Sequence, residues 1–479
     1  MTADGSGAAL GRFLAGDDAR VAIVDNAGSY TYRELRARTG FAANLLRERG
    51  VSPGDCVLMV APNTREAVVG YLGAVASGAR AVLVDRRAGE RDLEWAISVT
   101  RPRLLLRDSA VVPGEVPGLA LGDCADGIGV FVDPPERAGD DDAVVVFTSG
   151  TSSRPKGVRH SLASLAAGVR NFQQVVGFSA ADTAILVSPL ASITGVLQTH
   201  LALGNGGALV LEDAFDPAAT LQRAITHDAT VFGGVPFVLE QVLEQARLAG
   251  LTRLPLRAAA IGGAAIPREL LEDAAHTYGI VPSRIYGSSE CPVSFGSAPG
   301  DPLESRLADE GVALPGVQGR IDPSNGELQI RGQHVFLGYV DSGENASAFT
   351  ADGWFRTGDL ARLDGGRLTV TGRLKEVVVR KGVKISMAEV DSLLRGMPGV
   401  AEAATFAQPD PETGERLAVA VRPQADVRIG LDDVTRWLTS AGLPKWKLPE
   451  SLFAWSEPLP RTETGKVVRR ALASGPGDR

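Results

Sequence analysis

Short apolar runs alternate with helical segments through the middle of the chain, and this alternation restricts the fold more than any other feature of the sequence. The runs have the length of buried strands and comprise residues 143–147, 184–187, 208–211, 230–232, 258–261 and 283–286. After the first run, Ser161 is placed to cap a helix that reaches Val176. Strands and helices in alternation predict an α/β fold with a largely parallel sheet flanked by helices.

Three of these runs lead directly into loops of small and polar residues. The loops are Thr148–Gly157, Gly262-Gly263-Ala264 and Gly287-Ser288-Ser289-Glu290. In open α/β sheets, ligands bind beyond the carboxyl ends of the strands. We therefore expect the three loops to form one shared site.

The pattern changes after about residue 312. Residues 326–331 and 335–339 have the appearance of antiparallel strands, and Gly365-Gly366 marks a tight hairpin turn. From Gly372 onward, strands and helices follow one another in a smaller α+β unit.

A chain of 479 residues suits two or three domains. We place the boundary near Gly372, which gives a large domain over residues 1–371, with a small β-barrel-like subdomain, and a C-terminal domain over residues 372–479.

Charge and cysteine content exclude several classes of protein. The net charge of −8 and the absence of basic runs argue against a nucleic-acid partner. The three cysteines are widely spaced, and the five histidines lack the spacing of a transition-metal site. Apolar runs are too short for a membrane span, and the first residues lack the features of a signal peptide. We expect a cytoplasmic location.

The loop Thr148–Gly157 has the composition of an anion site. Successive backbone amides in a loop of small residues form an anion-binding nest, and the hydroxyl groups add donors. Lys156 adds a positive charge and is the only lysine before Lys375, in a chain where arginine is the usual cation. The order of residues differs from that of the GxxxxGK[ST] loop of P-loop NTPases.

Six segments then occur in the order typical of one known family. Phe147–Gly157 resembles the [YF]TSGTTGxPKG loop of the adenylate-forming superfamily, which includes acyl-CoA synthetases, adenylation domains and luciferases; Ser152-Ser153 replaces Thr-Gly. The other segments resemble the YGxTE, GELxxRG, [YW]xRTGD, GRxKD and PRTxxGK motifs; they are residues 286–290, 326–332, 354–359, 372–376 and 460–466. The resemblance covers nearly the whole chain and is greatest to AMP-forming acyl-CoA ligases.

The resemblance implies a reaction in two steps. A carboxylate attacks the α-phosphate of ATP, which gives an acyl-adenylate and pyrophosphate, and a thiol then displaces AMP to form a thioester. It also implies that the small α+β domain is mobile and rotates between the steps.

By resemblance, the nucleotide site draws on all three loops. Asp359 would bind both ribose hydroxyls, Glu290 would ligate Mg²⁺, and Arg373 would serve in nucleotide binding and catalysis. The remaining residues expected at the nucleotide are Thr148, Ser149, Gly150, Thr151, Ser152, Ser153, Lys156, Gly262, Gly263, Ala264, Tyr286, Gly287, Ser288, Ser289 and Lys466.

The C-terminal domain would act through a few residues only. Lys466 would bridge the carboxylate and the α-phosphate and align two anions that otherwise repel each other. Lys375 would be the hinge between the two orientations. Lys381 and Gly382 would line the tunnel that admits the thiol.

The acyl pocket departs from the family pattern. A segment that often reads PxFHxxG in the family is Pro189–Gly195 here, with small residues at both bulky positions. An acidic anchor for an α-amino group is also missing. We therefore expect a bulky, cyclic or aryl acid without an α-amino group, held by Ser192, Ile193, Thr194, Gly195, Phe232, Gly233, Gly262 and Tyr286.

Three functions stay open at this point. A ligase that uses ATP, Mg²⁺ and coenzyme A ranks first. A stand-alone adenylation enzyme that loads the phosphopantetheine of an acyl carrier protein ranks second, and in both cases the thiol comes from a separate molecule. A nucleotide-binding homologue without catalysis ranks third, because the charged residues of the motifs are intact.

Overall fold

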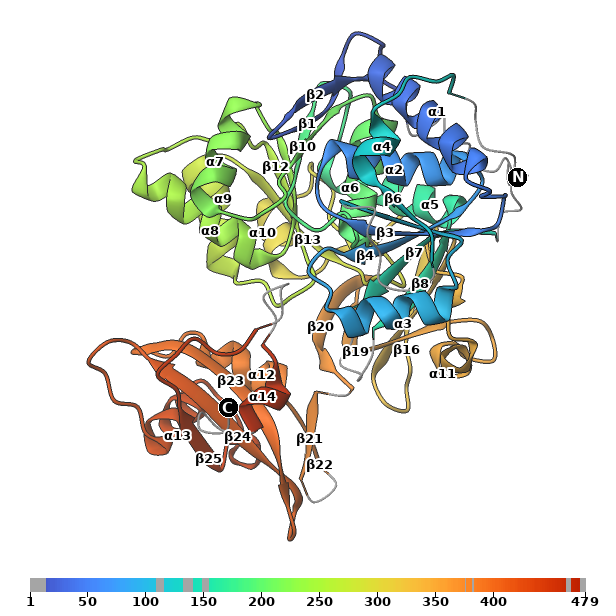
Figure 1. Ribbon diagram of the computed structural model, residues 1–479. Helices are drawn as coiled ribbons and strands as arrows, with labels where there is room; N and C mark the ends of the chain where they lie inside the picture. Colours follow the sequence, from blue (N-terminus) through green and yellow to red (C-terminus); the bar gives the residue numbers. More distant parts are fainter. Residues whose placement is uncertain are drawn as a thin grey trace. The chain divides into compact units, whose positions relative to one another are not determined.

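The computed structural model describes residues 14–108, 116–131, 141–148, 155–374, 376–380, 383–461 and 467–473 (Figure 1). Its packing divides the chain into two compact units. The large unit comprises Met1–Gly319 and Ile330–Phe355, and the small unit comprises Arg320–Gln329 and Arg356–Arg479. The boundary expected near Gly372 stays a prediction, because it concerns a hinge and these units reflect packing alone.

One sheet of the large unit contains the strands on either side of the serine-rich loop, which is the loop Thr148–Gly157 of the sequence. In the described part of the chain it has seven strands, in the order β18-β8-β7-β4-β3-β5-β6. Strands β3 to β7 are parallel, whereas β8 is antiparallel to β7 and to β18. The bounds are β3 (Cys56–Ala61), β4 (Arg80–Asp85), β5 (Leu104–Arg107), β6 (Gly118–Ala120), β7 (Asp142–Thr148), β8 (Lys156–Ser161) and β18 (Gly338–Tyr339).

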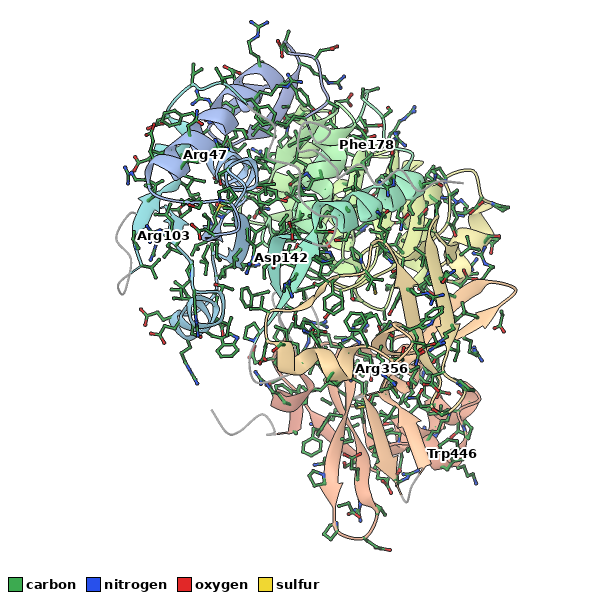
Figure 2. All side chains as sticks on the ribbon, turned by 90° about the vertical axis from the view of Figure 1, so that its right-hand side faces the viewer. Arg47, Arg103, Asp142, Phe178, Arg356 and Trp446 are labelled. Carbon is green, nitrogen blue, oxygen red and sulfur yellow. The ribbon has the colours of Figure 1, made fainter. Side chains whose placement is uncertain are left out.

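Asp142 anchors the start of β7 in this sheet (Figure 2). Its carboxylate pairs with Arg80 of β4 at 3.1 Å and with Arg159 of β8 at 2.8 Å. The side chain is only 11% exposed, so both pairs are partly shielded from solvent. They help to fix the register of the hairpin whose other end carries Thr148 and Lys156.

The second sheet contains the remaining expected strands. In the large unit its order is β15-β14-β13-β12-β11-β9-β10-β1-β2. The six strands from β13 to β1 in this order are parallel, as the alternation predicts. The bounds are β1 (Val21–Asp25), β2 (Gly28–Thr31), β9 (Thr183–Leu186), β10 (Ala208–Leu211), β11 (Val231–Gly234), β12 (Ala258–Ile261), β13 (Val281–Tyr286), β14 (Phe295–Gly296) and β15 (Val312–Ala313).

Helices lie between the two sheets and on their outer faces. α2 (Arg65–Ala76) contacts β1 of one sheet and β3 and β4 of the other, and every residue of it except Glu66 is buried. A helix that is apolar on all sides requires such a position. The other helices of this unit are α1 (Tyr32–Glu48), α3 (Glu90–Thr100), α4 (Leu121–Ala125), α5 (Leu162–Val176), α6 (Ile193–Gly204), α7 (Pro217–Thr226), α8 (Pro236–Leu248), α9 (Arg268–Tyr278), α10 (Leu303–Ala308) and α11 (Asn345–Ala348).

Local sequence signals set the ends of several helices. Thr31 and Glu34 form a capping box at the start of α1, and Gly50, at φ +82°, follows its end. Ser161 caps α5 by accepting the Ser164 amide at 3.1 Å. Among the described helices, none is both long and apolar enough to cross a lipid bilayer.

The small unit combines a group of antiparallel strands with an α+β segment. The expected barrel-like strands correspond to β16 (Val317–Ile321), β17 (Glu327–Gly332), β19 (Phe355–Asp364) and β20 (Arg367–Arg373), which are neighbours in this order. Gly365 and Gly366 form the turn between β19 and β20, with φ of +58° and +82°.

The C-terminal segment forms its own sheet and core. Its strands are β21 (Val377–Arg380), β22 (Val383–Ser386), β23 (Val400–Asp410), β24 (Gly414–Pro423) and β25 (Ser451–Ala454), and its helices are α12 (Met387–Leu394), α13 (Leu431–Ser440) and α14 (Arg469–Ala473). Apolar side chains of α12, α13 and β24 form one buried cluster, so this segment has the core of an α+β domain.

The prediction of a strand at residues 335–339 is mostly wrong. Of residues 335–339, only Gly338 and Tyr339 form a strand, paired with β8. The amide of Phe336 instead donates to the Glu290 carbonyl at 2.8 Å, and the amide of Leu337 donates to the Arg159 carbonyl at 2.8 Å. The backbone thus bonds to two different segments, and this brings β18 close to Glu290.

Candidate functional site

Part of the expected site lies outside the described residues. These positions are Ser149, Gly150, Thr151, Ser152, Ser153, Lys375, Lys381, Gly382 and Lys466. Their roles stay predictions. The other expected residues fall into groups in the large unit and one group in the small unit.

Lys156 is the first residue of β8, and its side chain contacts an aromatic ring and a carboxylate. It pairs in register with Thr148 at the end of β7, so the serine-rich loop connects two antiparallel strands. Its Nζ lies 2.5 Å from the Glu344 carboxylate and 4.8 Å from the centre of the Tyr339 ring. Both contacts are made by the first residue of β8, which lies near the end of the serine-rich loop in the sequence.

Glu290 is oriented by two hydroxyl groups. Tyr339 donates to its Oε1 at 2.9 Å, and Ser288 donates to its Oε2 at 2.8 Å. Burial raises the pKa of the Tyr339 hydroxyl well above its ordinary range, and the nearby carboxylate of Glu290 adds to this effect. Tyr339 is therefore protonated and acts as a donor.

The backbone beside Glu290 is held by a buried histidine. His160 lies on β8, and its Nε2 is 2.7 Å from the Ser289 carbonyl oxygen. Because a carbonyl only accepts, Nε2 carries the proton. Burial lowers the pKa of His160 to about 4, so the ring is neutral near pH 7.

In the loops that follow β12 and β13, close packing against neighbouring backbone requires glycine. A Cβ atom on Gly262 would lie 2.8 Å from the Ile285 carbonyl oxygen, and one on Gly287 would lie 2.5 Å from the Val293 amide nitrogen. Gly263 has φ of +77°, which strains any other residue. These loops therefore run close to neighbouring backbone, and the expected place of Gly262, Gly263 and Ala264 beside adenine stays a prediction.

The expected acyl-pocket residues lie at the start of α6, on β11, directly after β12 and at the end of β13. Ser192 caps α6 by accepting the Gly195 amide at 3.1 Å. A Cβ atom on Gly195 would lie 2.1 Å from the Pro189 carbonyl oxygen, so glycine is required there. Phe232 is 3% exposed and belongs to the core, while Tyr286 packs edge-on against Phe295 at 6.4 Å.

Asp359 and Arg373 come together in the small unit. They are opposite each other on β19 and β20, and Arg373 Nε lies 2.9 Å from Asp359 Oδ1. The Asp359 side chain is 8% exposed, whereas that of Arg373 is 44% exposed. The structure thus pairs two residues that the motifs place at the nucleotide.

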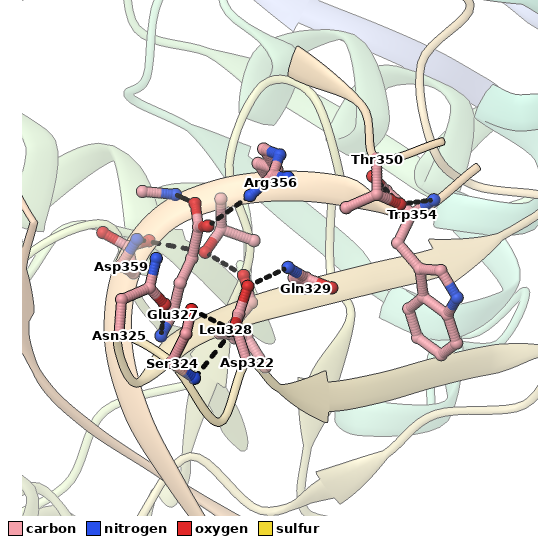
Figure 3. A network of polar contacts seen from close by, with 12 residues as sticks. Asp322, Ser324, Asn325, Glu327, Leu328, Gln329, Thr350, Trp354, Arg356 and Asp359 are labelled. Carbon is pink, nitrogen blue, oxygen red and sulfur yellow. Dashed lines mark hydrogen bonds and ion pairs between the residues drawn. The ribbon is translucent and has the colours of Figure 1, made fainter. Parts of the chain in front are cut away.

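A network of polar contacts supports the residues of β19 directly before Asp359 (Figure 3). Thr357 accepts the Asp359 amide at 3.1 Å and donates to the Leu328 carbonyl at 2.7 Å. Glu327 accepts the Gly358 amide at 2.9 Å. The contacts tie this part of β19 to β17, so the segments that resemble the GELxxRG and RTGD motifs lie side by side.

Three residues of the site were not expected from the sequence: Tyr339, Glu344 and His160. Tyr339 was assigned only to a strand, and His160 was considered only for metal spacing. The available signal was Lys156, because a single lysine near an anion site needs carboxylate or aromatic partners. Glu344 lies 188 residues away in the chain, so spacing alone could not identify it.

Comparison with known proteins agrees with these motifs. The profile of AMP-binding enzymes matches residues 12–340, and that of the AMP-binding enzyme C-terminal domain matches residues 389–466. Oxalate–CoA ligase of Arabidopsis thaliana is 30% identical over 479 residues, with 90% of each chain covered.

Two solved structures are similar over almost the whole chain. ATP-bound MatB from Rhodopseudomonas palustris is 28% identical, with 96% of each chain covered and a TM-score of 0.86. O-succinylbenzoate coenzyme A synthetase from Bacillus subtilis, in complex with ATP and magnesium ion, is 25% identical, with 95% of this chain and 96% of that chain covered and a TM-score of 0.83. The chain therefore belongs to the AMP-binding enzyme family, as an AMP-forming ligase of the acid–thiol class.

Proposed function

We propose that the protein activates a carboxylic acid with ATP and transfers the acyl group to coenzyme A. The observation that carries this proposal is the chain of contacts from Lys156 through Tyr339 to Glu290, because it holds a cation and a carboxylate together where β7 ends and β8 begins. A triphosphate and its metal ion need this pair of charges.

The residues around Glu290 suit Mg²⁺. Each carboxylate oxygen accepts one hydroxyl hydrogen bond and keeps further lone pairs. Among the described residues Glu290 forms no ion pair, because Lys156 is held by Glu344. One oriented carboxylate together with phosphate oxygens is a common set of Mg²⁺ ligands. Bound there, the ion would neutralise phosphate charge.

In the first step, a carboxylate oxygen of the acid attacks the α-phosphorus and the bond to the bridging β-phosphate oxygen breaks. Lys156 and the loop Thr148–Ser153 hold the β- and γ-phosphates, and Lys466 aligns the carboxylate with the α-phosphate. Asp359, kept in place by Arg373, binds the ribose. Pyrophosphate leaves with the electron pair.

In the second step, the sulfur of the thiol attacks the acyl carbonyl carbon, AMP leaves and the thiol proton is released. We assign the rotation between the steps to Lys375 and the thiol passage to Lys381 and Gly382. These roles follow from the matched motifs.

We propose a bulky, cyclic or aryl acid without an α-amino group. The small residues Ala191 and Ser192, directly before α6, support this size, because they stand where many members of the family carry a bulky pair. The named substrates of the relatives include oxalate and o-succinylbenzoate, so membership of the family leaves both small and aromatic acids open.

Coenzyme A is the preferred acceptor, and a carrier protein is the alternative. The relatives named above as ligases or synthetases of coenzyme A support this order. A cytoplasmic location stays a prediction from composition.

A screen of pyrophosphate release with aliphatic, cyclic and aryl acids tests the proposal. We expect release only with an acid present, and thioester formation with free coenzyme A. Productive turnover with a purified acyl carrier protein alone would reverse the order of acceptors. Absence of release with every acid would favour a binding protein without catalysis.

A further inference from the structure

Tyr339 contacts both charged residues of the proposed phosphate and metal site. Its hydroxyl donates to Glu290 at 2.9 Å, and the Lys156 ammonium group lies over its ring, 4.8 Å from the ring centre. Lys156 and Glu290 are 134 positions apart in the sequence, and a single side chain links them.

The ring is held firmly enough to set the positions of other groups. Tyr339 is 7% exposed, and Phe336 packs edge-on against it at 4.9 Å. Its backbone amide donates to Asn345 Oδ1 at 2.7 Å. Its strand, β18, pairs with β8, which begins at Lys156. Few rotamers remain open to a side chain enclosed in this way.

The two contacts act on different parts of the ligand. The hydroxyl fixes one oxygen of Glu290, so it sets the direction of the lone pairs offered to the metal ion. Partners that orient a ligating carboxylate change metal affinity when they are removed. The ring face attracts the ammonium group of Lys156, so it sets the direction of the charge offered to the phosphates.

We propose that Tyr339 is a positioning residue for both groups, with the hydroxyl serving the metal side and the ring serving the phosphate side. This role rests on the proposed function, since it requires ATP and Mg²⁺ at Glu290 and Lys156. It makes the two halves of the tyrosine separable by substitution.

Two substitutions separate the halves. Tyr339→Phe removes the hydroxyl and keeps the ring, whereas Tyr339→Leu removes both. We expect Tyr339→Phe to raise the Mg²⁺ concentration for half-maximal effect about tenfold, and to leave ATP binding without Mg²⁺ unchanged. Tyr339→Leu should in addition weaken ATP binding without Mg²⁺ by about fivefold.

The measurement is the shift of the melting temperature by ATP, with Mg²⁺ titrated from zero, so it needs neither acid nor turnover. Tyr278→Phe is the matched control. Tyr278 is buried in α9 and its hydroxyl donates to the Leu243 carbonyl at 3.2 Å, among residues that take no part in the site. The melting temperature of each variant without ligand reports any loss of folding.

The outcomes divide clearly. If Tyr339→Phe needs no more Mg²⁺ than Tyr278→Phe, or if Phe and Leu at position 339 give the same binding without Mg²⁺, the two-sided role is wrong. A wild-type protein that binds ATP with Mg²⁺ but releases no pyrophosphate with any acid overturns the proposed function and leaves this comparison valid. A wild-type protein that does not bind ATP overturns both.

Discussion

At the scale of single residues, Glu344 is the residue that we expect to compete most directly with ATP for Lys156. Its carboxylate lies 2.5 Å from Lys156 Nζ, where the motifs place a phosphate. Both side chains are partly exposed, at 26% for Lys156 and 39% for Glu344, so the pair is screened by solvent. Under the proposed function, the phosphates of ATP would compete with this carboxylate for the lysine.

We expect Glu344→Gln to lower the KM for ATP about threefold at unchanged kcat, because an exposed pair of this kind is worth roughly 0.2–1 kcal/mol. Initial rates of pyrophosphate release over a range of ATP concentrations check this. Glu304→Gln, which breaks an exposed pair with Arg268, is the control. A raised KM would mean that Glu344 assists ATP binding rather than competing with it.

The residues of the motifs could be predicted because each motif is local in the sequence. Lys156 and Glu290 lie in short segments that follow predicted strands, and Asp359 lies within a single run of residues. Tyr339 and Glu344 could not be predicted in this way, because their contacts depend on β18 pairing with β8 across more than a hundred residues. Long-range pairing of this kind is a property of the folded chain.

At the scale of elements, α14 holds the end of the segment that carries Lys466. Arg469 pairs with Asp391 of α12 at 2.8 Å, and Asp391 accepts the Thr405 amide at 2.6 Å. Arg461 and Val467, the residues on either side of positions 462–466, form a backbone bridge. We therefore expect the loss of the Arg469 contacts to disturb the placement of Lys466, three residues before it in the chain.

We expect Arg469→Leu to slow acyl-adenylate formation about tenfold, since small misplacements of a catalytic group reduce the rate strongly. Thioester formation from supplied acyl-adenylate should change less than twofold. Rapid-quench assays of each half-reaction measure the two rates. The neighbouring exposed Arg470→Leu is the control, and equal losses in both half-reactions would contradict the assignment.

The elements themselves were predicted well where the pattern is strong. The buried strands, the Ser161 cap of α5 and the turn at Gly365-Gly366 are all confirmed. The error at residues 335–339 has a physical cause: an apolar run with a glycine suits a strand, but its amides bond to Glu290 and Arg159 instead. Competition between such partners is decided by tertiary structure.

At the scale of the whole molecule, buried histidines make stability depend on pH. Burial lowers the pKa of His160 and His334 to about 4 and that of His200 to about 3. Between pH 6.5 and 4, the unfolded chain binds protons that the folded chain does not bind. Their contribution is therefore complete above pH 6.5 and is lost as the pH falls through this range.

We expect the free energy of unfolding to fall as the pH is lowered from 6.5 to 4, by on the order of 3 kcal/mol from His160 alone. His160→Gln should show a shallower decline over the same range. Urea titrations at a series of pH values measure it, with the exposed His276→Gln as control. Identical slopes for wild type and His160→Gln would refute the contribution of His160.

The central claim is that the protein makes an acyl-adenylate from an acid and ATP. The most direct test is to incubate it with ATP, Mg²⁺ and an acid from the screen, without any thiol, and to measure acyl-AMP after quenching. We predict about one equivalent of acyl-AMP per protein, conversion to thioester on addition of coenzyme A, and no acyl-AMP from Lys466→Ala. Formation of ADP, or acyl-AMP from Lys466→Ala at the wild-type rate, would contradict the account.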